Sequence, residues 1–380
     1  KAVVAVVTLK LLCTSYSLRV YNRIGFRFHR SMSYSSSTKI DISTSGENIL
    51  ALDFDGVICA SSTESSYSSI LAAGKQWPTK LPKPDQTDFG LIKAVVNNVR
   101  PIIETGYENI LVARYSYENL IHFSEMNPNS STADFNEWVQ TMTNDITSRW
   151  NPTFRDKLIF SYNSTKPELI QLFGSMRDEL IANDLDHWIG LNGLYPTVSK
   201  SLQSVSKRYE GDTSSLFKFV YIVTTKQERF VRAILTKNDI HIINQDGRSN
   251  NIVIDPAQPK DTLYSNIFDL DNIYGSKINV LKELTRRLRE NRNHLPLIHF
   301  VEDRYETLLN VIEHDRKLQL KIDQGVATEV EKMQSLSHVK LYLADWGYNT
   351  PGQRQQVVTE YADKIQLISQ EDFADLVSKF

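Results

Sequence analysis

The sequence predicts an α/β protein, a doubly wound parallel sheet with a mostly α-helical domain inserted after strand one. After about residue 216, short β-rich runs alternate with helical stretches, as in a parallel sheet with helices on both faces. Before that point, a single strand-like run at 48–54 precedes a long stretch whose apolar residues recur at helical spacing. We therefore predict a core of residues 41–62 plus 213–380 and a helical insertion at 63–212.

The individual core elements follow from residue type and periodicity. Runs rich in β-branched, aromatic and aliphatic residues predict strands, and amphipathic runs predict helices. The strands are expected at 48–54, 217–223, 295–302, 338–345 and 365–369, with short β candidates at 241–245 and 250–255. The helices are expected at 226–238, 276–292, 305–317 and 371–380.

The insertion is predicted to be a bundle of several helices. Leu91, Val95, Val99 and Ile102 illustrate its helical spacing. Segments rich in Pro, Asn and Ser, such as SEMNPNSSTADF, indicate loops between helices. In that segment, Thr132 or Asp134 is the expected helix N-cap.

Composition excludes several classes of protein. The 380-residue chain is 41 % hydrophobic and 23 % charged, which is ordinary for a soluble globular protein. Its net charge of −2 argues against the basic stripe of a nucleic-acid-binding protein. Two cysteines, Cys13 and Cys59, provide neither a disulfide framework nor a zinc-ligand set. No apolar run is long enough to span a bilayer, so we expect neither nucleic acid nor membrane as a partner.

Residues 1–40 are read separately from the fold. They contain no Asp or Glu but several Lys and Arg, and Arg19, Arg23, Arg27 and Arg30 would lie along one helix face. This composition is typical of a transit peptide for a chloroplast or mitochondrion. A short secretory segment interrupted by Lys10, or a disordered basic tail on a cytoplasmic protein, are the alternatives.

Polar and charged side chains follow several predicted strands at the point where each strand ends. In an open parallel sheet, the carboxyl ends of the strands form one edge, and that edge carries the reactive site. A lysine at the start of a predicted helix is expected at the same edge. The residues concerned are Asp53, Asp55, Thr224, Thr225, Lys277, Glu302 and Asp303.

This set of side chains has a definite chemical preference. Four converging carboxylates would repel one another, and some would bind protons unless a cation lay between them. Oxygen ligands without a suitable Cys or His set favour Mg²⁺ over zinc. An amine and a hydroxyl at the same edge suit a phosphoryl group.

Four stretches resemble the motifs of the haloacid dehalogenase-like (HAD) superfamily, in the usual order: ALDFDGVICAS, the strand ending in VTTK, YGSKINVLKEL, and HFVEDRYETL. ADWGYNT, followed by IQLIS and EDFADLV, is similar to the closing elements of the family's phosphatases. The resemblance covers about 48–62 and 216–380 and implies a Rossmann-like core. The position of the insertion is similar to that of the family's C1 cap domain.

The resemblance also implies roles for individual residues. Asp53 would be the nucleophile that forms an aspartyl-phosphate. Asp55 would be the general acid and base, and its backbone carbonyl would ligate Mg²⁺. Thr224 would hydrogen-bond the phosphoryl oxygens, and Lys277 would compensate negative charge.

Further residues complete the expected site. Asp303 with Glu302 would join Asp53 and Asp55 in holding the Mg²⁺ cofactor. The candidates for contact with substrate are Gly56, which permits a tight turn, and Thr225, Arg100 and Arg114. For Arg100 and Arg114 the alternative, which we favour, is a salt-bridging or helix-packing role in the insertion.

The chain departs from the family pattern at several places. Ala60 replaces a frequent acidic residue, and Thr307 stands where some members have an aspartate. Ile278 follows Lys277 where close phosphatases usually have proline, which leaves Lys282 as an alternative to Lys277.

The function implied by the resemblance is Mg²⁺-dependent hydrolysis of a small phosphorylated metabolite through an aspartyl-phosphate. Asp55 favours phosphoryl transfer over dehalogenation, because dehalogenases of the superfamily do not need that acid. A phosphomutase and a non-catalytic regulatory member are the alternatives. The sequence contains no G-x-S-x-G, P-loop or G-x-G-x-x-G signature that would predict another chemistry.

Overall fold

The computed structural model describes residues 48–81, 87–208, 220–226, 228–241, 276–291 and 295–380. The expected targeting segment at 1–40 lies outside them, as do residues 242–245 and the β candidate at 250–255. The chain divides into Lys1–Thr44 and Ser45–Phe380, and every described residue belongs to the second unit. Within the described residues, no helix combines the length and the apolar character that crossing a bilayer requires.

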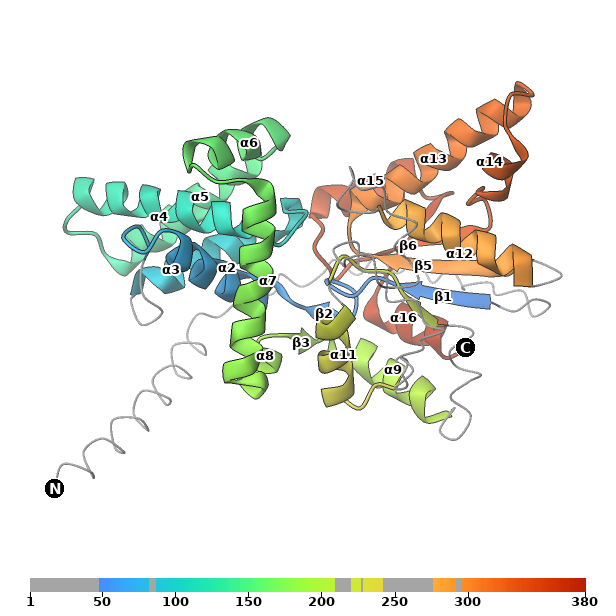
Figure 1. Ribbon diagram of the computed structural model, residues 1–380, viewed down its shortest axis with the longest axis horizontal. Coiled ribbons are helices and arrows are strands. Elements are labelled where there is room, and N and C mark those ends of the chain that lie inside the picture. Colours follow the sequence, from blue (N-terminus) through green and yellow to red (C-terminus); the bar gives the residue numbers. More distant parts are fainter. Residues whose placement is uncertain (1–47, 82–86, 209–219, 227, 242–275, 292–294) are drawn as a thin grey trace. The chain divides into compact units, whose positions relative to one another are not determined.

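A parallel sheet forms the centre of the core (Figure 1). Leu52 pairs with Ile222 on one side and with Val301 on the other, and Glu302 pairs with Leu343. The strand order is β4 (Val220–Ile222), β1 (Asn48–Leu52), β5 (Leu297–Glu302), β6 (Val339–Ala344) and β7 (Ile365–Ile368). The predicted parallel α/β sheet with an insertion after its first strand is confirmed.

Helices cover both faces of this sheet (Figure 1). Helices α12 (Lys277–Asn291), α13 (Tyr305–Asp323) and α15 (Pro351–Glu360) pack on one face, against Ile49 and Ala51 of β1. Helix α16 (Gln370–Val377) lies on the other face and packs against α9 (Pro196–Arg208). In the view of Figure 1, α11 (Glu228–Lys237) also lies on that side of the sheet. Because strand side chains alternate between faces, β1 is buried on both and reads as a continuous apolar run. Helix α15 and the short α14 (Glu329–Met333) were not among the predicted elements.

A two-stranded antiparallel ribbon marks both ends of the insertion. Cys59 in β2 (Cys59–Ala60) pairs with Leu194 in β3 (Gly193–Leu194). The residues between the two strands, 61–192, are called the cap here. Helix α9, which follows β3, packs against α16 of the core, and Arg208 Nη1 donates to the Ser378 carbonyl at 3.1 Å. The insertion therefore ends at β3, earlier than the predicted residue 212.

The cap is helical, as predicted, and has its own hydrophobic core. Its α-helices are α2 (Ser62–Gln76), α3 (Thr87–Asn98), α4 (Glu108–Met126), α5 (Thr132–Arg149), α6 (Pro152–Ser161), α7 (Lys166–Asn183) and α8 (Leu185–Gly190), with a 3₁₀ turn at η1 (Arg100–Ile102). Ser131, rather than Thr132 or Asp134, is the N-cap of α5. Its Oγ accepts a hydrogen bond from the Asp134 backbone N–H, and the Asp134 carboxylate accepts one from Ser131 N–H.

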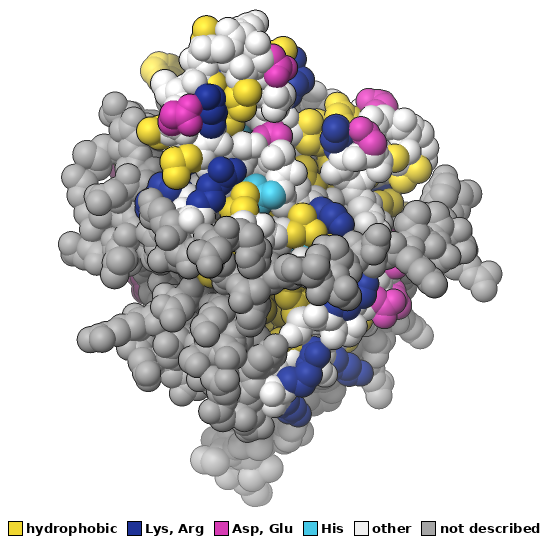
Figure 2. All heavy atoms as spheres, turned by 90° about the vertical axis from the view of Figure 1, so that its right-hand side faces the viewer, with side chains coloured by type: hydrophobic (Ala, Val, Ile, Leu, Met, Phe, Trp, Pro, Cys, Tyr) yellow, Lys and Arg dark blue, Asp and Glu magenta, His cyan; other side chains and the backbone are white. Residues whose placement is uncertain are grey.

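Figure 2 shows one face of the molecule, on which basic side chains lie among acidic and hydrophobic ones. Several exposed bases of α12–α14 pair with acids of the same region, such as Arg316 with Glu313 and Lys321 with Glu331. Exposed pairs of this kind contribute little to stability. These ion pairs belong to the solvent-exposed surface of the core. The buried charged residues lie at another place in the molecule.

Candidate active site

The carboxyl ends of the three adjacent strands β4, β1 and β5 converge as expected. The Asp53 backbone N–H donates to the Val301 carbonyl at 2.9 Å, which fixes Asp53 directly after β1. Glu302 is the last residue of β5, and Asp303 follows it. Thr224 and Thr225 come just after β4. The sheet order therefore brings together side chains about 250 residues apart in the sequence.

Three carboxylates and one lysine form a buried group, called the carboxylate cluster: Asp53, Glu302, Asp303 and Lys277. Lys277 Nζ lies 2.8 Å from Asp53 Oδ2 and 2.7 Å from Glu302 Oε2. Lys277 is the first residue of α12, and its side chain is only 10 % exposed. The lysine therefore bridges the ends of two neighbouring strands.

The carboxylate cluster holds more negative charge than its lysine balances. Burial, and then the nearby Glu302 and Asp55 carboxylates, raise the pKa of Asp53 to about 7 despite the opposing effect of Lys277. Burial and Asp53 raise the pKa of Asp303 to about 6. Burial would lower the pKa of Lys277, but Asp53 and Glu302 raise it above its ordinary value. These directions are those of a site that lacks positive charge.

The oxygen atoms of the carboxylate cluster fit a hard divalent cation. Asp53, Glu302 and Asp303 each offer one oxygen, and these oxygens lie within 4.8 Å of one another. Both oxygens of Glu302 already accept hydrogen bonds, from Lys277 Nζ and from the Arg304 backbone N–H. Asp53 and Asp303 are thus the more available ligands, and Glu302 orients Lys277. Mg²⁺ suits such an all-oxygen set.

The Asp303 side chain accepts a backbone hydrogen bond and is closely packed against two glycines. The backbone N–H of Tyr348 donates to Asp303 Oδ2 at 2.7 Å. A Cβ on Gly56 would lie 1.9 Å from that same oxygen, and a Cβ on Gly347 would lie 2.3 Å from Asp303 Cβ. Gly56 also has a φ of +90°, which other residues rarely adopt. Gly56 therefore shapes the turn beside the carboxylates, and its side of the site leaves no room for a side chain.

Asp55 belongs to a second buried group of charges, called the balanced cluster: Asp55, Glu64, Arg177 and Lys226. Lys226 Nζ lies 3.2 Å from Asp55 Oδ1 and 3.6 Å from Glu64 Oε2. Arg177 makes a two-point contact with Glu64, Nε to Oε1 at 2.8 Å and Nη2 to Oε2 at 2.6 Å. Two acids and two bases from α2, α7 and the ends of β1 and β4 thus neutralise one another.

The pKa shifts in the balanced cluster run opposite to those in the carboxylate cluster. Burial would raise the pKa of Asp55, but Lys226 and Arg100 hold it below its ordinary value. Burial would likewise raise the pKa of Glu64, but Arg177 and Lys226 lower it. Sequence reasoning missed Lys226 and Arg177 as site residues. The signal for Lys226 was its position two residues after Thr224 at a strand end.

A cavity of about 340 Å³ opens beside Asp53. Several predicted site residues line it: Asp53, Asp55, Arg100, Thr225, Lys277 and Asp303. Thr224, Glu302, Gly56 and Lys282 are not among its lining residues. Thr224 is buried, and its Oγ1 accepts a hydrogen bond from the Lys226 backbone N–H at 3.1 Å. The structure thus places the hydroxyl of Thr225, rather than that of Thr224, at the cavity wall.

Arg114 lies apart from this cavity. Its guanidinium stacks over the rings of Tyr162, at 3.9 Å, and Trp77, at 4.4 Å, and its Nε pairs with Glu118. These contacts are within the cap, where the side chain has a packing role. Arg100, by contrast, lies with its guanidinium 4.6 Å over the Tyr348 ring, beside Asp303.

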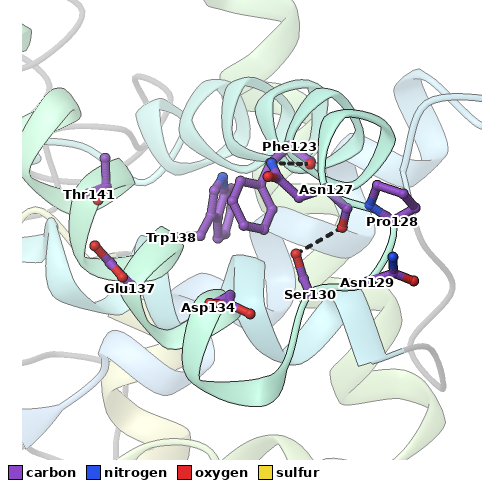
Figure 3. Close-up of a pocket in the computed structure, with 9 residues that line it drawn as sticks. All are labelled: Phe123, Asn127, Pro128, Asn129, Ser130, Asp134, Glu137, Trp138 and Thr141. Carbon is purple, nitrogen blue, oxygen red and sulfur yellow. Dashed lines mark hydrogen bonds between the residues drawn. The ribbon is translucent and has the colours of Figure 1, made fainter.

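A larger cavity of about 540 Å³ lies at the turn between α4 and α5 (Figure 3). Trp138 and Phe123 form its wall, and the polar side chains around it bond locally, as Ser130 Oγ does with the Asn127 carbonyl at 2.9 Å. It includes none of the buried charges described above. Size alone therefore does not identify the reactive site of this molecule.

No protein-family model matches the chain, and no curated protein matches it. Among solved structures, one similar chain is described as a predicted phosphatase from Clostridium acetobutylicum, with 11 % identity and a TM-score of 0.42. The match covers 88 % of this chain and 100 % of that one.

Another similar chain is described as a haloacid dehalogenase-like family hydrolase from Streptococcus pneumoniae. It has 11 % identity and a TM-score of 0.37, and the match covers 88 % of this chain and 99 % of that one.

Proposed function

We propose that this protein is a Mg²⁺-dependent phosphatase that hydrolyses a small phosphate ester through an aspartyl-phosphate. The observation that carries the proposal is the arrangement at the end of β1. Asp53 lies between Lys277 and the excess carboxylates Glu302 and Asp303, and Asp55 lies two residues further along. A nucleophile, a cation site and a proton carrier thus face one cavity.

In the first step, an Asp53 carboxylate oxygen attacks phosphorus, and the bond from phosphorus to the ester oxygen breaks. The protonated carboxyl of Asp55 gives its proton to the leaving oxygen, so the alcohol departs neutral. Although Lys226 and Arg100 favour the ionised form of Asp55, a phosphoryl dianion bound nearby favours the protonated form.

In the second step, the Asp55 carboxylate takes a proton from a water molecule that attacks phosphorus. The bond between phosphorus and Asp53 breaks, phosphate leaves, and Asp55 is protonated again for the next cycle. Lys277 stays beside Asp53 throughout and offsets the charge of the carboxylate and the phosphoryl oxygens. Mg²⁺, held by Asp53 and Asp303, would supply the positive charge that the carboxylate cluster lacks.

The cap contributes by covering the site. Arg304 Nη1 donates to the Ile103 carbonyl at 2.5 Å, and the Ser62 backbone N–H donates to the Tyr348 hydroxyl at 2.8 Å. These contacts join the cap to the loops that follow β5 and β6. A covered cavity favours transfer of the phosphoryl group to Asp53 over loss to bulk water.

The test is phosphate release by the purified chain from a panel of small phosphate esters with Mg²⁺, and its loss in EDTA. Asp53→Asn should lower kcat by at least about 10³-fold with an unchanged circular dichroism spectrum. Asp345→Asn is the matched control, because Asp345 follows neighbouring β6 and does not line the cavity.

Retained activity in folded Asp53→Asn would refute Asp53 as the nucleophile. Conversion of a sugar phosphate to its isomer without phosphate release would replace the phosphatase by a phosphomutase. Absence of any turnover across the panel would favour a non-catalytic role.

A further inference from the structure

The cap side of the site cavity is polar. Helix η1 and the loop after it contribute Arg100, Glu104 and Thr105, while α6 and α7 contribute Arg155 and Lys166. These five residues are called the roof here. The carboxylates Asp53, Asp55 and Asp303 of the core line the same cavity, and Arg100 is the roof residue beside Asp303. A cavity of about 340 Å³ is at the small end of the range for ligand sites, so the substrate is compact.

The roof carries more positive than negative charge. Arg100, Arg155 and Lys166 face the cavity together with Arg304 from the core, whereas Glu104 and the adjacent Glu108 are the acids on this side. The Glu108 carboxylate is already engaged: it accepts backbone N–H bonds from Glu104 at 2.8 Å and from Thr105 at 3.3 Å. It also lies 3.3 Å from Arg155 Nη1. Its role is to close the loop 104–108 and to hold Arg155 in place.

The roof also contains two buried polar atoms that the described residues leave unpaired. Arg100 Nε and Thr105 Oγ1 are both shielded from solvent, and neither has a hydrogen-bond partner among the described residues. The Arg100 guanidinium is otherwise anchored, because its Nη1 donates to the Ile103 carbonyl at 2.7 Å. A buried donor without an acceptor is costly. The cationic groups that line the cavity, rather than these two shielded atoms, are therefore the groups that a ligand would contact.

We infer that the roof binds a second anionic group of the substrate, so that the substrate is a small phosphate ester that also carries a carboxylate or a second phosphate. This inference rests on the proposed function, which assigns the phosphoryl group to the Asp53 end of the cavity. The cavity is then polarised to match a molecule with two anionic ends: one faces the metal-binding carboxylates, and the other faces the cations of the cap.

The experiment compares matched pairs of esters with the purified 380-residue chain and Mg²⁺. One series is ω-carboxyalkyl phosphates of increasing chain length, each paired with its carboxamide. A second series pairs bisphosphates of short diols with the corresponding monophosphates. In at least one pair, we expect kcat/KM to be about 10- to 100-fold higher for the ester that carries a second anionic group than for its partner without one.

The variant Lys166→Gln tests whether the roof is responsible for the preference for substrates with a second anionic group. It should lower the ratio of kcat/KM between anionic and neutral partners about tenfold. Lys157→Gln is the matched control, because Lys157 is an exposed lysine on α6 that does not line the cavity, and its ratio should match the wild type. Thermal melts check that both variants remain folded.

The outcomes separate the two proposals. Phosphate release with equal kcat/KM for both members of every pair would overturn the inference and leave the phosphatase standing. A preference for anionic partners that Lys166→Gln does not change would overturn the assignment to the roof. No release from any ester, charged or neutral, would overturn the phosphatase itself. A stronger preference in the bisphosphate series than in the carboxylate series would identify phosphate as the second anion.

Discussion

Two groups of buried charges lie side by side in this molecule, and they behave in opposite ways. The balanced cluster contains two acids and two bases, and the pKa values of Asp55 and Glu64 are held low. The carboxylate cluster contains three acids and one base, and the pKa values of Asp53 and Asp303 rise to about 7 and about 6. Three members of each cluster are buried, and the fourth, Asp55 or Lys277, is slightly exposed, so burial does not explain the difference.

The difference lies in the number of cations. In the balanced cluster, each buried charge has a partner. Glu64, for example, accepts hydrogen bonds from Arg177 and also from Ser68 Oγ at 2.6 Å. Buried charges that are paired in this way hold elements together. Among the described residues, the carboxylate cluster remains short of positive charge, and a bound cation would supply it. In the proposed active site, the nucleophile Asp53 thus lies where counter-charge is deficient, whereas the proton carrier Asp55 lies where charges are balanced.

The largest expected effect comes from removing the single base of the carboxylate cluster. Lys277→Met should lower kcat by about 10²–10³-fold, because the charge on Asp53 and on the phosphoryl group loses its partner. Steady-state phosphate release at saturating Mg²⁺ measures it. Lys282→Met is the control on the same helix, and it should keep kcat within about twofold because Lys282 does not line the cavity. If Lys282→Met lost most of its kcat while Lys277→Met stayed active, Lys282 rather than Lys277 would be the lysine that acts on Asp53 and the phosphoryl group.

Breaking the balanced cluster should affect stability first. Arg177→Met leaves Glu64 buried without its main partner, and the expected cost is about 3–5 kcal/mol in the free energy of unfolding. Urea denaturation measures it. The double variant Arg177→Met with Glu64→Gln should recover part of this loss, because the uncompensated charge is gone. If the double variant were as unstable as the single one, charge pairing would not be what this cluster contributes.

Without metal, the two clusters should also make contributions to the free energy of unfolding that change with pH in opposite directions. The folded-state pKa of Asp53, about 7, exceeds its ordinary value of 3.8. Its stabilising contribution is therefore complete below about pH 4 and is lost as the pH rises towards 7, at up to about 1.4 kcal/mol per pH unit. Asp55 and Glu64 have lowered pKa values, so their contributions are present above pH 4 to 5 and are lost on acidification.

Urea midpoints in EDTA at pH 5, 6 and 7 measure the first of these effects. Saturating Mg²⁺ should flatten the decline, because the cation takes the place of the bound protons. An identical decline with and without Mg²⁺ would mean that the carboxylate cluster is not a metal site.

The smallest expected effect concerns the contact between Tyr348 and the cap. Tyr348→Phe removes the acceptor of the Ser62 backbone N–H and should cost about 1 kcal/mol in the free energy of unfolding. Tyr117→Phe, which changes the same group on a partly buried cap residue, should stay within about 0.5 kcal/mol. Equal losses in the two variants would show that the hydroxyl contact at Ser62 carries no particular stability.

Much of the fold could be predicted because its signals are local. The buried strands β1, β5 and β6 appear as apolar runs of the right length, and the carboxyl-end rule places Asp53, Glu302 and Asp303 together once the strands are parallel. The residue at which the cap ends could not be predicted from such local signals. Helix α9 is one more amphipathic helix that follows the cap helices in the sequence, and only its packing against α16 assigns it to the core.

The same limit applies to the cap residues. Arg100 and Arg114 look alike in the sequence, fourteen positions apart in one helical region. Packing places Arg100 at the cavity and Arg114 between Trp77 and Tyr162. Periodicity shows which face of a helix is apolar, but it does not show what lies opposite the polar face.

The sequence by itself thus determined the sheet, its insertion point and the acids at the strand ends, because strand polarity fixes where a residue after a strand must lie. Only the tertiary structure decided which charges are shared. Lys226 could have paired with any acid near β4, yet it lies between Asp55 and Glu64, while Lys277 lies alone among three carboxylates. Counter-charge depends on distances between elements far apart in the chain, and those distances are set by packing.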